Sequence, residues 1–195
     1  RQSYTGKSVI WISYVVYGIV YNPFVFAAWT LKDFKIHLYK EGIRIEMIKN
    51  IIFDVGNVLF SYRWHEMLVE FGLTDEEAKT AGEKIFNQNI WLEMDLGNIT
   101  TKEAIARYAE RLPEYKELTA WFISHPEKMP VPRTRVWQQI KQLKEMGYKI
   151  YLLSNYSEEL FSCHVKDAEF MNYIGGKVVS YELHIANPDP AIYTA

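Results

Sequence analysis

Two short apolar runs, rich in β-branched and aromatic residues, constrain the fold of this chain more than any other feature. Residues 48–53 (IKNIIF) end at Asp54, and residues 149–153 (KIYLL) end at Ser154 and Asn155. Apolar runs of this length that stop at turn-forming residues predict buried strands. Because helical patterns separate the runs, we expect a parallel sheet with helical crossovers.

The region between the two runs has the pattern of a small helical module. Thr74 with Glu77, and Thr100 with Glu103, each form the sequence signature of a capping box at a helix start. Prolines 126, 130 and 132 then interrupt the helical pattern. Amphipathic stretches predict helices over 64–71, 75–88, 102–111 and 114–124 before the prolines, and over 133–146 and 157–163 after them. Residues 177–180 are a third strand candidate, and Ala191 begins a last helix.

Polar residues follow both main strands at the edge of a parallel sheet where ligands bind. A carboxylate such as Asp54, placed directly after a buried strand, can act as a nucleophile or bind Mg²⁺. The backbone N–H groups of residues 55–57 can cradle phosphate oxygens, and the Ser154 hydroxyl and Asn155 amide can bind them. Each of these residues alone is equally typical of an ordinary turn.

Three segments in the right order resemble the motifs of the haloacid dehalogenase (HAD) superfamily. They are 51–59 (IIFDVGNVL), 151–155 (YLLSN) and 187–193 (NPDPAIY), the last in the version usually written with Lys at its first position. Residues 91–100 are similar to cap sequences of the phosphatase-like branch with a helical cap, subfamily IA. The resemblance covers residues 47–195 and implies a Rossmann-like, three-layer α/β fold. Residues 47–61 and 131–195 would form an incomplete core, and 62–130 an inserted helical cap.

The resemblance also implies a chemistry. Asp54 would be phosphorylated and then hydrolysed, Mg²⁺ would be held by the Asp54 carboxylate and the Gly56 carbonyl, and Asn57, Ser154 and Asn155 would bind the phosphate of a small phosphorylated metabolite. Such catalysis depends mainly on positioning and charge neutralisation.

Three departures from the family pattern weaken the expectation of activity. Gly56 stands where many members have a second Asp that acts as the general acid and base. Asn187 replaces the Lys of the third motif, and an amide supplies no positive charge. The chain ends before the family's fourth, acidic motif, so we expect either a fragment or a degenerate copy of low activity. A 2-haloacid dehalogenase and a non-catalytic protein that keeps the fold are the alternatives.

Composition sets the remaining expectations. A net charge of −2 argues against a nucleic-acid partner. The single cysteine, Cys163, favours a reducing, cytoplasmic setting. No feature of the sequence indicates an oligomeric state.

Residues 1–46 are a leader with no sign of chemistry. Residues 9–31 form a run without charged side chains. The run is long enough to cross a bilayer, although polar residues interrupt it. The leader is a marginal membrane anchor, a folded element packed on the domain, or translated sequence upstream of a start at Met47. We prefer the third, because MIKNIIFD is a natural beginning for such a domain.

Overall fold

The structure, a computed structural model, describes residues 8–12 and 48–194. Most of the leader lies outside the described residues. This includes residues 13–31 of the possible membrane span 9–31. Among the residues that are described, no helix is long and apolar enough to span a membrane.

The described chain alternates strands with helices. The strands are β1 (Ser8–Ile12), β2 (Ile48–Phe53), β3 (Phe60–Tyr62), β4 (Pro130–Pro132), β5 (Lys149–Ser154) and β6 (Ile174–Val179). The α-helices are α2 (Trp64–Phe71), α3 (Asp75–Phe86), α4 (Asn89–Asp95), α5 (Thr101–Arg111), α6 (Lys116–Ser124), α7 (Thr134–Glu145), α8 (Glu158–Val165) and α9 (Ser180–Leu183). Short 3₁₀ turns are η2 (Pro113–Tyr115), η3 (Pro126–Lys128), η4 (Glu169–Tyr173) and η5 (Pro190–Thr194).

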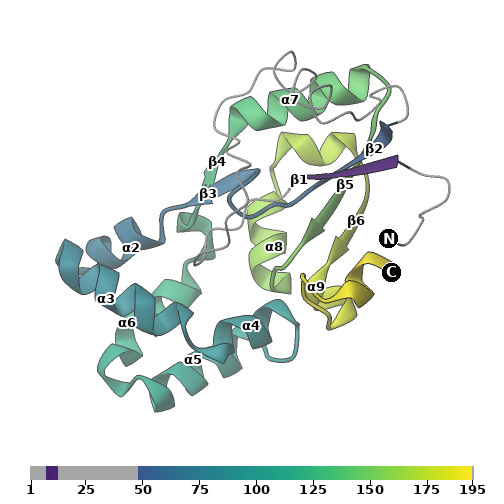
Figure 1. Ribbon diagram of the computed structural model, residues 1–195. Helices are drawn as coiled ribbons and strands as arrows, with labels where there is room; N and C mark the ends of the chain where they lie inside the picture. The colour runs from purple at the N-terminus through teal and green to yellow at the C-terminus, as the bar shows by residue number, and fades with distance from the viewer. Residues whose placement is uncertain (1–7, 13–47, 195) are drawn as a thin grey trace. The chain divides into compact units, whose positions relative to one another are not determined.

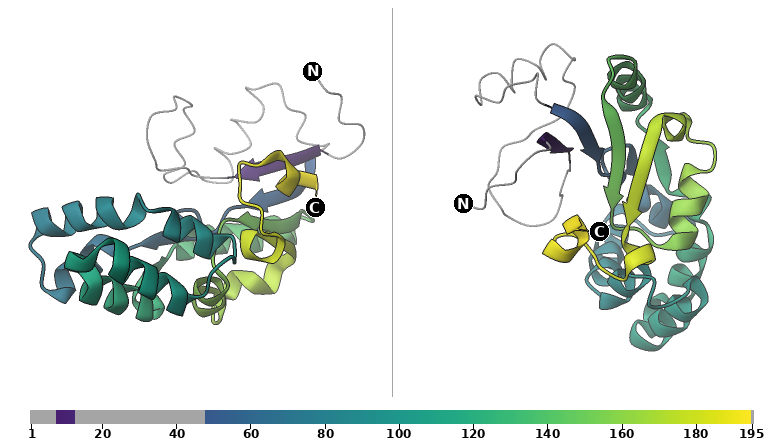
Figure 2. Two further views of the ribbon diagram at one scale, coloured as in Figure 1. Left: turned by 90° about the horizontal axis from the view of Figure 1, so that it is seen from below. Right: turned by 90° about the vertical axis from the view of Figure 1, so that its right-hand side faces the viewer.

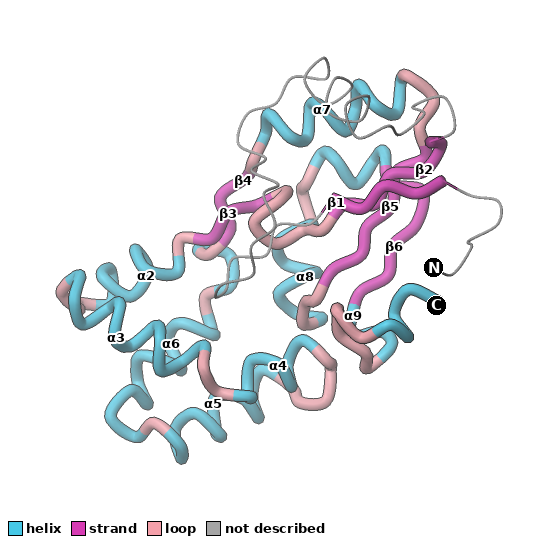
Figure 3. Tube along the Cα trace, in the orientation of Figure 1, coloured by secondary structure: helices cyan, strands magenta, loops and turns pink. Residues whose placement is uncertain are grey.

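The main sheet has the strand order β1-β2-β5-β6 (Figures 1 and 3). β2 pairs in parallel with β1 on one side and with β5 on the other, and Phe53 lies opposite Leu152. β5 and β6 point the same way in the right-hand view of Figure 2. The predicted parallel α/β sheet is therefore confirmed, including the adjacency of the two runs from which it was inferred.

The third strand and the last helix differ in extent from the prediction. β6 begins at Ile174 and ends at Val179, so Ser180 opens α9 instead of closing the strand. The run 174–176 reads Ile-Gly-Gly, and two glycines hide the strand pattern. The segment after Ala191 is the 3₁₀ turn η5 rather than an α-helix.

The described residues form two compact units. The first contains 8–12, 48–59, 133–153 and 169–177, and the second contains 60–132, 154–168 and 178–194. In the first unit Ile140 and Leu143 of α7 are buried, and Trp137 packs on Phe170 with 5.2 Å between ring centroids. The division into a 1–46 leader, a core and a 62–130 cap stays a prediction.

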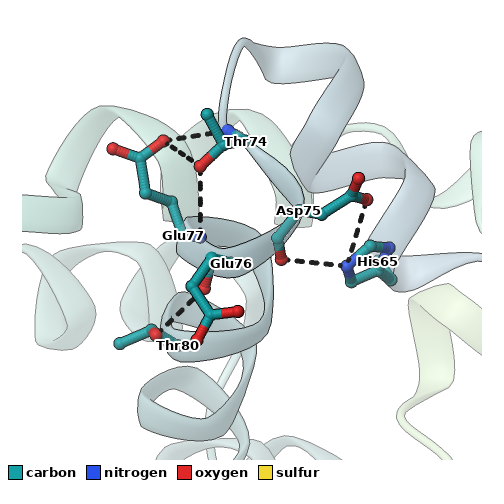
Figure 4. A network of polar contacts seen from close by, with 6 residues as sticks. All are labelled: His65, Thr74, Asp75, Glu76, Glu77 and Thr80. Atoms are coloured by element: carbon teal, nitrogen blue, oxygen red, sulfur yellow. Dashed lines mark hydrogen bonds and ion pairs between the residues drawn. The ribbon is translucent and has the colours of Figure 1, made fainter.

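The second unit contains the predicted helical segment, and Figure 1 shows α2 to α6 gathered together. Both predicted capping boxes are present: the Thr74 hydroxyl accepts the Glu77 N–H while the Glu77 carboxylate accepts the Thr74 N–H (Figure 4), and Thr100 and Glu103 repeat the arrangement. These contacts satisfy N–H groups that a helix start otherwise leaves unbonded. At the two ends of the segment, β3 and β4 pair antiparallel.

Candidate functional site

Asp54 directly follows β2 at the carboxyl edge of the main sheet. The carboxylate accepts a hydrogen bond from the Val55 N–H at 2.7 Å, and the residue is half-buried. The chain then turns sharply, because the Val55 carbonyl accepts the Val58 and Leu59 N–H groups and Asn57 adopts a left-handed conformation with φ of 55°. Asn tolerates this conformation better than most residues. The turn leaves Asp54, Gly56 and Asn57 close together in sequence and only partly covered.

This loop has the donor types that Mg²⁺ prefers. The Asp54 carboxylate and the Gly56 carbonyl are both oxygen donors, and Mg²⁺ is commonly bound by one or two protein oxygens together with water and substrate phosphate. No cluster of three or more His, Cys, Asp or Glu side chains suited to a metal occurs in the described part of the chain. A site of this composition therefore fits Mg²⁺ shared with a phosphorylated substrate and does not resemble an all-protein metal cage.

The second unit brings two other predicted site residues together. The Asn155 side chain donates to the Asn187 carbonyl at 2.8 Å and accepts the Asn187 N–H at 2.7 Å. The two residues are 32 positions apart in sequence. The segment after β5 and the segment that begins the third motif are thus joined by two hydrogen bonds. Ser154, the last residue of β5, is buried with 2% of its surface exposed.

The side chain and the backbone of Asn155 therefore have different roles. Its side-chain amide is used to hold the loop that contains Asn187. Phosphate binding by its backbone N–H stays a prediction, as does phosphate binding by Ser154 and Asn57.

Asn187 uses its side chain within its own loop. Its Oδ1 accepts the hydroxyl of Tyr193 at 2.5 Å, and burial raises the pKa of that phenol. The amide carries no charge, so this position supplies none of the cationic stabilisation that the third motif normally contributes.

A buried polar chain lies beside these loops in the second unit, and the sequence analysis did not single it out. The Tyr62 hydroxyl lies 2.6 Å from the Tyr156 hydroxyl, which lies 2.8 Å from His164 Nδ1. His164 Nε2 lies 2.8 Å from the Pro126 carbonyl. Because a carbonyl only accepts, Nε2 carries the proton and Nδ1 accepts from Tyr156. Burial lowers the pKa of His164, so the neutral ring fits this arrangement.

A second polar cluster surrounds Asp95 at the end of α4. The Ser180 hydroxyl accepts the Tyr156 N–H at 3.0 Å and donates a short hydrogen bond to the Asp95 carbonyl. Asp95 is half-buried, and burial raises the pKa of its carboxyl to about 7, against a smaller opposing effect of the Ser157 backbone.

Little in the sequence indicates that these residues form polar clusters. Tyr156 and His164 are eight residues apart, and Asp95 lies within the cap-like stretch 91–100. Residues at such positions are equally typical of an ordinary core or surface. The contacts could therefore not be inferred from the sequence. His184 is exposed, and its Nδ1 lies 2.7 Å from the Leu96 carbonyl.

Comparisons with known proteins agree with this architecture. No protein-family model matches the chain, and no curated protein matches it. Solved structures do match. A HAD family enzyme from Bacteroides thetaiotaomicron, in complex with magnesium and inorganic phosphate, aligns with a TM-score of 0.56 and 24% identity over 75% of this chain and 76% of its own.

Two further structures align comparably well. A HAD-like family hydrolase from Porphyromonas gingivalis has a TM-score of 0.55 and 18% identity over 76% of this chain and 74% of its own. L-2-haloacid dehalogenase from Xanthobacter autotrophicus has a TM-score of 0.53 and 16% identity over 76% of this chain and 63% of its own. The chain therefore has the HAD-like fold, and the predicted resemblance to the HAD superfamily is confirmed at the level of the fold.

Proposed function

We propose that this chain comes from a Mg²⁺-dependent phosphohydrolase that acts on a small phosphorylated metabolite through an aspartyl-phosphate on Asp54. The observation that carries the proposal is the position of Asp54. It follows β2 directly, at the carboxyl end of a parallel pair in which Phe53 lies opposite Leu152. Ligands of open parallel sheets bind at this edge. The phosphate and magnesium bound to the Bacteroides enzyme support the same substrate class.

In the proposed reaction, an Asp54 carboxylate oxygen forms a bond to phosphorus while the bond to the leaving oxygen breaks. The leaving oxygen takes its proton from solvent water, because Gly56 supplies no acid. Water then attacks the aspartyl-phosphate, which releases inorganic phosphate and regenerates the carboxylate. The Asp54 carboxylate and the Gly56 carbonyl would hold Mg²⁺, which supplies charge neutralisation for the phosphoryl group. Asn57, Ser154 and Asn155 would position that group, and the 62–130 segment would act as the cap that selects the substrate.

A dehalogenase is the second candidate, favoured by a specific feature of the loop. Gly56 provides no acid to protonate a leaving alcohol, whereas a halide leaves without a proton. The Xanthobacter dehalogenase also shares the fold. A non-catalytic role is the third, because the Asn187 side chain is uncharged and bonded to Tyr193.

The setting that we propose is cytoplasmic. It rests on the single cysteine, Cys163, whose thiol pKa is raised by burial, so that little reactive thiolate forms. Recovery of the 1–195 chain only in the membrane fraction would favour the tether through 9–31 instead.

The test uses the full 1–195 chain with and without Mg²⁺. Hydrolysis of p-nitrophenyl phosphate and release of chloride from 2-chloropropionate are measured in parallel, together with the Asp54→Asn variant. The matched control is Asp167→Asn, which neutralises an exposed Asp in the second unit. Phosphate ester turnover that needs Mg²⁺ and Asp54 supports the proposal, whereas chloride release alone supports the dehalogenase. Absence of both activities supports the non-catalytic alternative.

A further inference from the structure

A buried tyrosine connects the loop 154–157, which follows β5, to three other parts of the second unit. The Tyr156 backbone N–H donates to the Ser180 hydroxyl at 3.0 Å. Its side-chain hydroxyl lies 2.6 Å from that of Tyr62 and 2.8 Å from His164 Nδ1. Because Tyr156 is bonded through both its backbone and its side chain, its position influences that of the whole loop.

The hydrogen bonds along this chain run in one direction, which the Pro126 carbonyl sets. His164 Nε2 lies 2.8 Å from that carbonyl and must donate to it, so Nδ1 of the neutral ring accepts from Tyr156. The Tyr156 oxygen in turn accepts from the Tyr62 hydroxyl. The acceptor at Nδ1 therefore sets the direction in which the Tyr156 hydroxyl points.

The same chain reaches both ends of the helical segment 62–130. Tyr62 closes β3, Pro126 opens η3 shortly before β4, and β3 and β4 pair with each other. The helix that contains His164, α8, packs on η3. Tyr156 and His164 are thus bonded to the two places where the helical segment joins the rest of the chain.

Packing fixes the two rings in this geometry. The Tyr156 and His164 rings are buried and nearly perpendicular, with 5.7 Å between their centroids. Phe161 packs edge-on against Tyr156, and the Phe60 ring lies 6.2 Å from that of His164. Burial also lowers the pKa of His164, so the ring is neutral at neutral pH and its Nδ1 can accept. A hydrogen bond between rings held in this way can fix the backbone that carries them.

We propose that His164 is a positioning residue that acts through Tyr156 to hold the loop 154–157 in place, so that Ser154 and Asn155 can bind a phosphoryl group. The consequence for phosphate binding rests on the proposed function, whereas the hold on the loop does not. In this role His164 acts on the loop and not on the reacting atoms.

Two substitutions separate the two hydrogen bonds of His164. His164→Asn keeps an acceptor near the position of Nδ1 and loses the donor to Pro126, whereas His164→Gln keeps a donor near Nε2 and loses the acceptor for Tyr156. Each removes one hydrogen bond, so a merely structural residue would respond equally to both. Tyr156→Phe removes the same bond as His164→Gln and keeps the aromatic ring. The matched control is Tyr108→Phe, which removes another buried hydroxyl, one that donates to the Ile85 carbonyl at 3.1 Å.

The first experiment measures hydrogen exchange of the residue 156 amide in the full chain by ¹⁵N–¹H NMR. This N–H is bonded to the Ser180 hydroxyl, so its exchange reports whether the loop is held. We expect His164→Gln and Tyr156→Phe to speed its exchange about tenfold relative to the Ala81 amide inside α3. His164→Asn and Tyr108→Phe should leave that ratio within about twofold of wild type. Equal acceleration in the two His164 variants, or none in either, would overturn the proposal whether or not the protein hydrolyses phosphate esters.

The second experiment measures the dissociation constant of inorganic phosphate in the presence of Mg²⁺. We expect His164→Gln and Tyr156→Phe to weaken binding about fivefold, because a loop that is held less firmly must be ordered when phosphate binds. His164→Asn and Tyr108→Phe should bind phosphate within about twofold of wild type. Weakening that is equal in the two His164 variants, or confined to His164→Asn, would contradict the positioning role.

Absence of phosphate binding in wild type and in every variant, together with the expected exchange pattern, would refute the proposed function while supporting the hold of His164 on the loop. Phosphate binding that needs Mg²⁺, with no difference in exchange between the His164 variants, would refute the positioning role alone. The two proposals can therefore fail separately.

Discussion

Replacement of Asp95 by Asn should stabilise the protein at neutral and alkaline pH. The Asp95 carboxyl has a pKa of about 7 against an ordinary value of 3.8. If the whole difference reflects the cost of burying the charge, ionised Asp95 destabilises the fold by at most about 4 kcal/mol. Because the residue is half-buried, solvent screening makes the actual cost smaller than this upper limit. We therefore expect Asp95→Asn to raise the free energy of unfolding by roughly 2 kcal/mol above about pH 8.

The pH dependence follows from proton binding. Between the two pKa values the folded protein binds a proton at Asp95 that the unfolded chain has lost, so this residue lowers stability progressively as pH rises from about 4 to about 7. Below that window the carboxyl is protonated in both states, and wild type and Asp95→Asn should unfold alike. Above it the difference between them should be constant.

The assay is urea unfolding of the two proteins across this pH range, with the difference in free energy as the observable. Other titrating groups cancel in the difference, including His164, whose lowered pKa makes stability fall on acidification. Asp167→Asn, at the exposed end of the turn that follows α8, should show no pH-dependent difference from wild type. A difference for Asp95→Asn that is independent of pH, or that shrinks as pH rises, would refute the reasoning.

Three further changes test other parts of the structure. If the proposed function holds, Asn187→Lys should raise kcat/KM for p-nitrophenyl phosphate by about tenfold or more, because it would supply a cation to the phosphoryl group. Ala191→Lys on the exposed η5 turn should not, and equal gains would point to non-specific charge attraction. Gly97→Ala should lower the free energy of unfolding by at least about 2 kcal/mol, since φ is +67° and the new Cβ would meet the Tyr181 carbonyl. Thr74→Ala should lower it by about 1 kcal/mol through loss of the α3 cap; unchanged chemical denaturation midpoints would contradict both.

The parts of the fold that could be predicted from sequence depend on local patterns. The run 48–53 and the run 149–153 are continuous and apolar, so their pairing as buried parallel strands follows from their composition and the helices between them. Thr74 and Glu77 are three residues apart, which is the spacing of a capping box at a helix start. Asp54 could be placed at the carboxyl edge of the sheet for the same reason, because its position depends only on the strand before it.

The remaining features depend on contacts between residues that are far apart in the chain. Ser180 and the Asp95 carbonyl are 85 positions apart, and Tyr62 and Tyr156 are 94 apart. A Ser or Tyr in an amphipathic segment gives no sign of which distant group it will meet. The bounds of β6 were predicted incorrectly for a different reason. Its two glycines lack the side chains from which a strand pattern is recognised.

The contact between Asn155 and Asn187 explains how this chain can have the HAD-like fold without the charge of the third motif. Asn155 bonds to the backbone N–H and carbonyl of residue 187, so the two loops are joined whatever side chain that residue carries. The Asn187 side chain accepts a hydrogen bond from Tyr193, which lies within the same loop. Loop geometry and charge are therefore separable at this position: with Asn in place of Lys the side chain has no positive charge, while the backbone bonds that join the loops remain. The effect of the missing charge on catalysis is therefore measured by comparing Asn187 with Lys at this one position in one protein.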